Sequence, residues 1–171
     1  MLPSRDECIS LLRSNGCSED VVEHCIAVSN LAVKIARRCD ADECLVESGG
    51  LLHDIGRCRT HAINHGVEGA KLARKLKLPI PLIQIIERHV GAGIDRAEAR
   101  RLGLPKKDYS PKTLEEMIVA HADNLIDGTK RITVKESVAS MVRKNLHDQA
   151  SRILALHREL SERCGLDVDS V

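Results

Sequence analysis

Apolar residues recur every three or four positions along almost the whole of this 171-residue chain. Near the N-terminus, for example, His24, Leu31 and Ile35 share one face of a helix. No stretch alternates apolar and polar residues for long enough to predict a β-strand, and no repeat or linker divides the chain. The sequence therefore predicts one all-α domain over residues 1–171, a bundle of roughly seven to nine helices.

Capping residues and prolines indicate where these helices begin. Thr133 with Glu136 forms a capping-box pattern, and Gly56 is suited to the C-terminal cap of a helix over residues 42–55. We expect a core of about residues 18–130 and C-terminal helices over about 133–164. The expected helix starts are Ser4, Ser18, Asp42, Asn64, Pro79, residue 95, Thr113, Thr133 and Asp148.

Charge and aromatic content narrow the classes of partner. The formal net charge is only +1, so there is no bulk electrostatic reason to expect a nucleic-acid or membrane partner. The basic runs 96–101 and 106–107 leave a short-range RNA contact as a minor alternative to plain exposed faces. The chain has one tyrosine and no phenylalanine or tryptophan, so its core is aliphatic and a site that stacks on bases is nearly excluded.

Seven cysteines are spread along the chain without a Cys-x-x-Cys pair. Because their number is odd and several lie in helical patterns, we expect free thiols in a reducing cytosol. The N-terminus lacks the apolar core of a signal peptide, and no apolar run has transmembrane length. These features predict a cytoplasmic protein with no membrane partner.

The adjacent pair His53-Asp54 at the end of an apolar stretch suggests a metal site. Burying such a pair is costly unless something binds it. His24 and Asp123 lie on apolar stretches of their own predicted helices and should point inward. Two imidazoles and two carboxylates from three helices make a site for one divalent metal ion.

His65 and His89 each lie on the inner face of a predicted helix and suggest a second metal ion. If they converge on the pair, Asp54 would bridge two metals that hold a hydroxide and clamp a phosphate. His61 competes with His65 for this role, since residues four apart share a helix face. If His65 is the ligand, His61 either lies near the mouth as a substrate contact or general acid, or is a plain loop residue. By contrast, His121 should project away from Asp123, and His147 and His157 are expected at the surface or between helices.

In this order, His24, His53-Asp54 and Asp123 resemble the ligand set of the HD superfamily of metal-dependent phosphohydrolases. The run 53–56 resembles its HDIG subgroup, and residues 65–70 and 86–89 resemble the segments that carry second-metal histidines in two-metal members. Residues 120–125 resemble the family's closing aspartate helix. The chain is similar, over about residues 20–130, to small stand-alone HDIG proteins, many of them archaeal. Bacterial HD-type diadenosine tetraphosphate hydrolases share the six-ligand layout, whereas the absence of a Gly-Tyr-Pro motif after His89 argues against a cyclic-di-GMP phosphodiesterase.

The resemblance implies a phosphohydrolase in which metal-activated hydroxide attacks a phosphomonoester or phosphodiester, a nucleotide or dinucleotide polyphosphate being the expected substrate. Asp54 would hold the metal or metals and help to take the proton. Arg57, Lys130 and Arg131 would bind the phosphoryl oxygens. One or two divalent ions are expected. The ligand types do not choose among Fe, Mn, Mg, Ni, Co and Zn, although Fe or Mn is favoured if the site is dinuclear.

Two other functions use the same residues. The metal could be structural, in a module that senses a nucleotide or accompanies RNA-modification enzymes. A minor alternative is an HD-type di-iron oxygenase. The sequence makes no prediction of oligomeric state.

Overall fold

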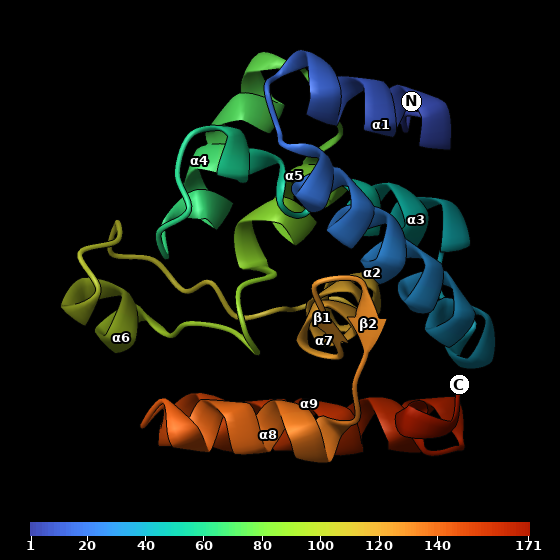
Figure 1. The fold of residues 1–171 in the computed structure, drawn as a ribbon, viewed down its shortest axis with the longest axis vertical. Helices are drawn as coiled ribbons and strands as arrows, with labels where there is room; N and C mark the ends of the chain where they lie inside the picture. Colours follow the sequence, from blue (N-terminus) through green and yellow to red (C-terminus); the bar gives the residue numbers. More distant parts are fainter.

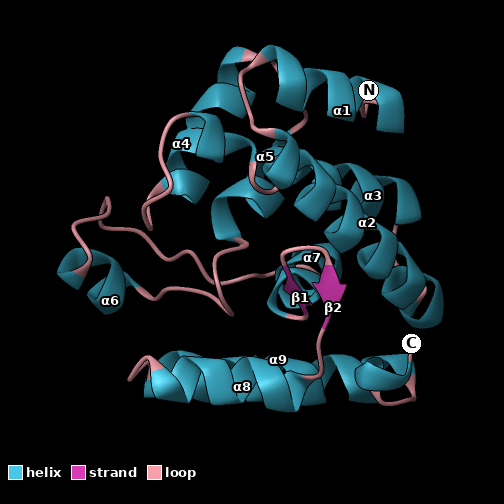
Figure 2. Cartoon of the chain, in the orientation of Figure 1, coloured by secondary structure: helices cyan, strands magenta, loops and turns pink.

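The computed structural model describes all 171 residues and is almost entirely helical, as predicted (Figures 1 and 2). None of its helices combines the length and apolar character needed to cross a bilayer. The α-helices are α1 (Arg5–Ser14), α2 (Glu19–Cys39), α3 (Glu43–Leu52), α4 (His65–Lys75), α5 (Ile80–Arg88), α6 (Arg96–Arg101), α7 (Leu114–Asn124), α8 (Val134–Arg143) and α9 (His147–Cys164). The remaining elements are the 3-10 helices η1 (Ile55–Cys58) and η2 (Val168–Ser170) and the strands β1 (Ile126–Asp127) and β2 (Lys130–Arg131).

Local capping explains several of the helix starts. Ser4 and Thr133 each form a complete capping box, in which the hydroxyl accepts from the third helical N–H and that residue's glutamate accepts from the cap N–H. Ser18 precedes α2 without a side-chain cap bond. Acidic residues occupy the first turn of α2 and basic residues its last, which is the order that the helix dipole favours.

Helix α3 is shorter than predicted, and this changes the role of Gly56. The helix ends at Leu52, and the chain then turns through Asp54 into η1. Gly56 is therefore not a helix cap. It lies against the backbone of α4, where a Cβ atom would overlap the His65 carbonyl oxygen and lie 2.5 Å from the Gly69 nitrogen. The glycine is needed for this close approach, which holds α4 against the turn carrying Asp54.

A short hairpin after α7 was not predicted. Ile126 and Asp127 pair antiparallel with Arg131 and Lys130 around a turn at Gly128. Two residues per strand are too few to show a period-two pattern, so the prediction that the chain contains no strand was wrong. In Figure 1 the hairpin lies over one end of α7, facing α2.

Two aliphatic clusters form most of the core, as the lack of aromatic residues requires. One joins α1, α3, α4 and α5 around residues such as Leu12 and Leu52, and the other joins α7 and α9 around residues such as Ile118 and Ile153. Helix α2 contributes to both clusters and so connects the two parts (Figure 1). Tyr109 is buried in a third, smaller cluster.

One cysteine pair departs from the expectation of free thiols. Cys39 at the end of α2 and Cys164 at the end of α9 form a disulfide, with Cα atoms 4.3 Å apart. The other five cysteines are free. The two partners are 125 residues apart, so no local spacing in the sequence could identify them.

Candidate metal centre

Six predicted metal ligands from five elements meet around the Asp54 side chain. Residues at the C-terminal ends of α3 and α5 and at the start of α4 meet residues from the second turn of α2 and the last turn of α7. The six are His24 (α2), His53 and Asp54 (after α3), His65 (start of α4), His89 (after α5) and Asp123 (α7).

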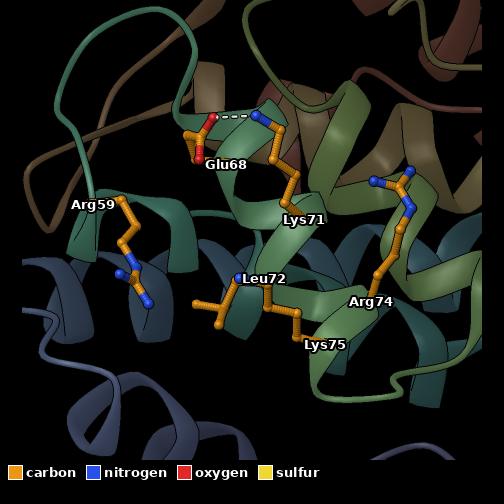
Figure 3. A pocket seen from close by; sticks show the side chains of 6 residues that line it. All are labelled: Arg59, Glu68, Lys71, Leu72, Arg74 and Lys75. Carbon is orange, nitrogen blue, oxygen red and sulfur yellow. Dashed lines mark hydrogen bonds and ion pairs between the residues drawn. The ribbon is translucent and has the colours of Figure 1, made fainter.

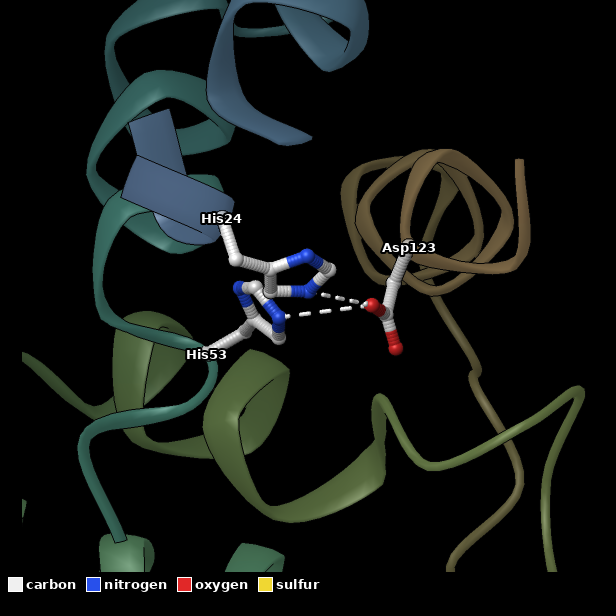
Figure 4. Close-up of side chains that lie close together, drawn as sticks. All are labelled: His24, His53 and Asp123. Carbon is white, nitrogen blue, oxygen red and sulfur yellow. Dashed lines mark hydrogen bonds and ion pairs between the residues drawn. The ribbon is translucent and has the colours of Figure 1, made fainter. Parts of the chain in front are cut away.

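The first half of the centre contains His24, His53 and Asp123, which converge in Figure 4. The Oδ1 atom of Asp123 lies 3.0 Å from the His24 Nε2 and 3.5 Å from the His53 Nε2. The same two nitrogens lie 4.0 and 3.8 Å from Oδ2 of Asp54. Two imidazoles and two carboxylates thus point at one small volume.

The second half faces the other oxygen of Asp54. His65 Nε2 and His89 Nε2 lie 3.2 and 3.4 Å from Asp54 Oδ1, and 3.0 Å from each other. The two oxygens of one carboxylate therefore face two different pairs of histidines. A carboxylate that bridges two metal ions a few Å apart needs this arrangement.

The remaining ring nitrogen of each histidine is fixed by the backbone. Each Nδ1 lies 2.7–2.8 Å from a carbonyl oxygen, which can only accept, so each Nδ1 carries the proton and each neutral ring has a bare Nε2. Such contacts set the orientation and tautomer of metal-binding histidines in proteins. The acceptors for His24, His53, His65 and His89 are Gly128, Gly50, Ala62 and Ile86, respectively.

Buried atoms at the centre of the cluster lack hydrogen-bond partners. His53 Nε2 and Asp54 Oδ1 are both buried and unpartnered. The bare Nε2 atoms of His65 and His89 face one another with no proton between them when both rings are neutral. Lone pairs and a carboxylate gathered in this way are costly to bury unless a cation satisfies them. The residues present therefore fit a bound divalent ion.

The ionisation of the carboxylates agrees with this. Burial alone would raise the pKa of Asp54, but with no metal bound the positive charge of His53 and the close Nε2 atoms of His65 and His89 hold it well below its usual range. Burial would likewise raise the pKa of Asp123, yet with no metal bound the close imidazoles of His24 and His53 lower it. Burial also lowers the pKa of His89, which favours the neutral ring that a metal requires.

The centre is partly open to solvent at His24 and Asp123. The side chains of His24 and Asp123 are 17% and 24% exposed, whereas His53 and His89 are almost completely buried. Arg57 is 30% exposed, and its Nε donates to Asp54 Oδ2. Arg57 therefore extends from the bridging carboxylate to the surface on its own side of the cluster.

The other predicted site residues lie farther out. His61 is exposed in the loop before α4 and makes no hydrogen bond or ion pair. Lys130 is exposed on β2. The neighbouring Arg131 donates to the Val168 carbonyl oxygen at 3.1 Å and lies 3.8 Å from Asp169, so it contacts the C-terminal segment. Their roles in catalysis and phosphate binding stay predictions.

Sequence reasoning missed two features around the centre. The Gly128 carbonyl, which orients His24, comes from the unpredicted hairpin. Arg88, directly before His89, forms a buried ion pair with Glu116 at 2.8 Å and so joins α5 to α7. His121 points away from the centre, as expected, and its Nε2 lies 3.0 Å from His157 Nδ1 between α7 and α9.

Comparison with known sequences gives a family match over residues 21–127, described as HD domain. An uncharacterised protein of Methanocaldococcus jannaschii is 49% identical over 163 residues, which cover 91% of this chain and 96% of that protein. A tRNA (cytidine(56)-2'-O)-methyltransferase of Picrophilus torridus is 44% identical over 170 residues, which cover 99% of this chain and 50% of that enzyme. The chain thus spans about half the length of the curated methyltransferases that it matches.

Among solved structures, the HD domain of the L. monocytogenes phosphodiesterase PgpH superposes with a TM-score of 0.58 and 17% sequence identity. The match covers 87% of this chain and 94% of that domain. A second structure of the same domain, with a TM-score of 0.57, is a complex with cyclic-di-AMP. At this level of identity the likeness shows that the fold is shared.

Proposed function

The chain belongs to the HD domain family, and we propose that it is a divalent-metal-dependent phosphohydrolase. One observation carries the proposal: the two oxygens of Asp54 face two separate pairs of histidine Nε2 atoms. Four histidines are aligned on this single carboxylate, and all four have a protonated Nδ1 that leaves Nε2 free. A structural core would not need this degree of convergence.

The chain's own residues would divide the work as follows. Divalent ions held by the six ligands would supply Lewis acidity and a water molecule of lowered pKa. Asp54 would hold the ligand geometry as an ionised carboxylate, since its pKa is low and its two oxygens face the two pairs of histidines. Its part in taking a proton from the attacking water stays a prediction. Arg57 would hold phosphoryl oxygens at the open side, because its guanidinium already spans from Asp54 to solvent. Lys130, Arg131 and His61 remain candidates for further phosphate contacts and, for His61, for protonating the leaving group.

We infer that the substrate is a nucleotide or dinucleotide phosphoester recognised mainly through its phosphates. The PgpH domain with the same fold binds cyclic-di-AMP. In this chain the only phenol ring, Tyr109, is buried away from solvent, so no aromatic side chain is available to stack on a base. Charged groups at the mouth are then the main means of recognition.

The test is hydrolysis of nucleoside monophosphates, cyclic dinucleotides and dinucleotide polyphosphates by protein loaded with Mn²⁺ or Fe²⁺. The products are separated by chromatography, because cleavage of a diester or of a dinucleotide polyphosphate releases no inorganic phosphate. We expect turnover of at least one class by the wild type and loss of activity in Asp54→Asn. The matched control is Asp127→Asn, which changes an exposed carboxylate on β1. Full activity in Asp54→Asn, or no activity with any metal or substrate class, would contradict the proposal.

A second candidate function is association with RNA. The observation that favours it is the match of nearly the whole chain to half of two archaeal tRNA (cytidine(56)-2'-O)-methyltransferases. In those proteins a domain like this one is part of an enzyme named for a tRNA substrate. We propose that this chain also contacts RNA, whether or not it hydrolyses a nucleotide. Binding of an unmodified tRNA transcript, measured by fluorescence anisotropy, tests this directly.

A further inference from the structure

The segment between α5 and α7 forms a small lobe, residues 94–109, that carries α6 and projects from the helical body (Figure 1). Its ends are tied together, since the Tyr109 N–H donates to the Ile94 carbonyl at 2.9 Å. Both residues are buried with Ala99, Leu104 and Val67 of α4 in an apolar cluster. The lobe is therefore a packed unit with a fixed outer surface.

Two ion pairs join the lobe to the helical body, one through Glu98 and one through Lys107. Glu98 of α6 accepts from Arg152 of α9 at 2.8 Å. On the other side, Lys107 pairs with the buried Glu87 of α5. These contacts lie on the inner side of the lobe and fix its orientation on α5 and α9.

One hollow on the surface of the lobe is lined by cations alone. Arg96, Arg100, Arg101 and Lys106 are all exposed, and none of them forms an ion pair. Together with Ala97 they line one shallow hollow that contains no acidic side chain. In a chain whose net charge is only +1, four unpaired cations on one small surface are a marked local concentration.

A second hollow, on α4, is also lined by basic side chains, but two of its four cations are paired with glutamates (Figure 3). There Lys71 pairs with Glu68 at 2.7 Å, and Arg74 pairs with Glu87 at 3.2 Å. Only its other two basic side chains are unpaired. The hollow is lined by Arg59, Glu68, Lys71, Leu72, Arg74 and Lys75.

The lobe also adjoins the second half of the metal centre. Val67, in the lobe's apolar cluster, is two residues after His65. Val90, which packs against the same cluster, directly follows His89. A large polyanion bound on the lobe would therefore lie beside the elements that carry these two histidines.

We propose that the outer surface of the lobe binds the phosphate backbone of base-paired RNA, an inference that rests on the RNA association proposed above. Three of the four cations are arginines, whose planar guanidinium groups match phosphate oxygens in pairs. The lobe exposes no aromatic ring, since Tyr109 is buried, so it offers contacts to phosphates rather than stacking on unpaired bases. The lobe would thus position an RNA without reading its sequence.

The experiment compares two double variants that each remove two unpaired cations. The lobe pair is Arg96→Gln with Arg100→Gln, and the matched control on α4 is Arg59→Gln with Lys75→Gln. The full-length proteins are titrated into a fluorescein-labelled, unmodified tRNA transcript between about 50 and 200 mM salt. Melting temperatures of both variants establish that they are folded.

We expect the lobe pair to bind at least about tenfold more weakly and to lower the salt slope of the affinity by about 1.8, or 0.9 per lost phosphate contact. The control pair should bind nearly as well as the wild type. If the wild type binds tRNA and the lobe pair binds equally well, or if both variants lose equal affinity, the assignment to the lobe is overturned while the RNA association stands. No binding by the wild type overturns both and leaves the phosphohydrolase proposal intact. Preferential binding to anionic phosphatidylglycerol vesicles would also overturn it.

Discussion

The Nδ1 of His24 lies 2.7 Å from the carbonyl oxygen of Gly128, although 104 residues separate them. For His53, His65 and His89, the Nδ1 partner is a carbonyl three residues earlier in the chain. His24 lies in the second turn of α2, where the preceding carbonyls are used by the helix itself. The hairpin β1–β2 therefore supplies the carbonyl that orients this ligand.

Distortion of the hairpin should loosen His24 without unfolding the protein. Gly128 has φ +61 and no neighbouring atom within 4 Å of a Cβ, so Gly128→Val introduces backbone strain alone. We expect a stability loss of roughly 1–2 kcal/mol and a metal affinity about 10–100 times lower. Gly103→Val is the control, since Gly103 has φ +71 and equally open surroundings. Isothermal titration with Mn²⁺ should separate the two; equal affinities would show that the Gly128 carbonyl does not matter.

The sequence singled out residues that converge in the structure, but not the groups that hold them in place. His24, His53-Asp54 and Asp123 stand out because polar residues on apolar helix faces conflict with burial. Their tautomers depend on where backbone carbonyls lie, and the hairpin that orients His24 has strands too short to produce a pattern. Gly56 was recognised as conformationally special, yet its reason is a tertiary contact with α4 rather than a helix cap.

Removal of one histidine from the second half should change metal content by one ion. His89→Ala leaves His65 and one Asp54 oxygen facing the remaining space, which is too few ligands for tight binding. We expect about two equivalents of metal in the wild type and about one in the variant, measured by inductively coupled plasma mass spectrometry.

His61→Ala is the matched control for that experiment, since His61 is exposed in the loop before α4 and forms no hydrogen bond. Its metal content should equal that of the wild type. One equivalent in all three proteins would instead mean a mononuclear centre formed by the first half. A loss in His61→Ala would mean that the ligand assignment between His61 and His65 is wrong.

Gly56→Ala should damage both stability and the second half of the site. The added methyl group would overlap the His65 carbonyl oxygen and lie 2.5 Å from the Gly69 nitrogen, and both are backbone atoms that cannot rotate away. We expect destabilisation of about 1–3 kcal/mol from overpacking. In thermal unfolding, Gly66→Ala is a milder comparison, because its nearest neighbour would be a Val90 methyl at 3.2 Å. An unchanged melting temperature in Gly56→Ala would show that α4 can move away freely.

The disulfide between Cys39 and Cys164 predicts a simple thiol count. Denatured, unreduced protein should show five reactive thiols, and fully reduced protein seven. Reduction should lower the free energy of unfolding by about 2–4 kcal/mol, because the closed loop is long. Cys164→Ser should reproduce the effect of reduction, whereas Cys44→Ser at an exposed free cysteine should not. Seven thiols before reduction would show that the pair is not bonded in solution.

Glu87 should give the protein part of its acid sensitivity. Burial would raise the pKa of this carboxyl, but hydrogen bonds from Lys107 and Arg74 lower it below the ordinary 4.5. The stabilisation is therefore fully present above about pH 5 and is lost as the pH falls through the lowered pKa of the folded state. Glu87→Gln should cost about 1–2 kcal/mol at pH 7, less than a fully buried pair, because Arg74 and Lys107 are 50% and 43% exposed.

The pH profile distinguishes that cause from a simple packing defect. The free energy of unfolding, from urea titrations between about pH 3 and 7, should fall less steeply with acid in Glu87→Gln than in the wild type. Glu159→Gln, at an exposed helix pair with Arg163, should change stability by less than about 0.5 kcal/mol and leave the slope unchanged. A parallel downward shift of the whole Glu87→Gln curve would mean that the carboxylate contributes through shape alone. Protonation of Glu87 should also affect the lobe, because the ion pair of Lys107 with Glu87 holds the lobe against α5. We therefore expect acid to loosen the lobe before the helical body unfolds.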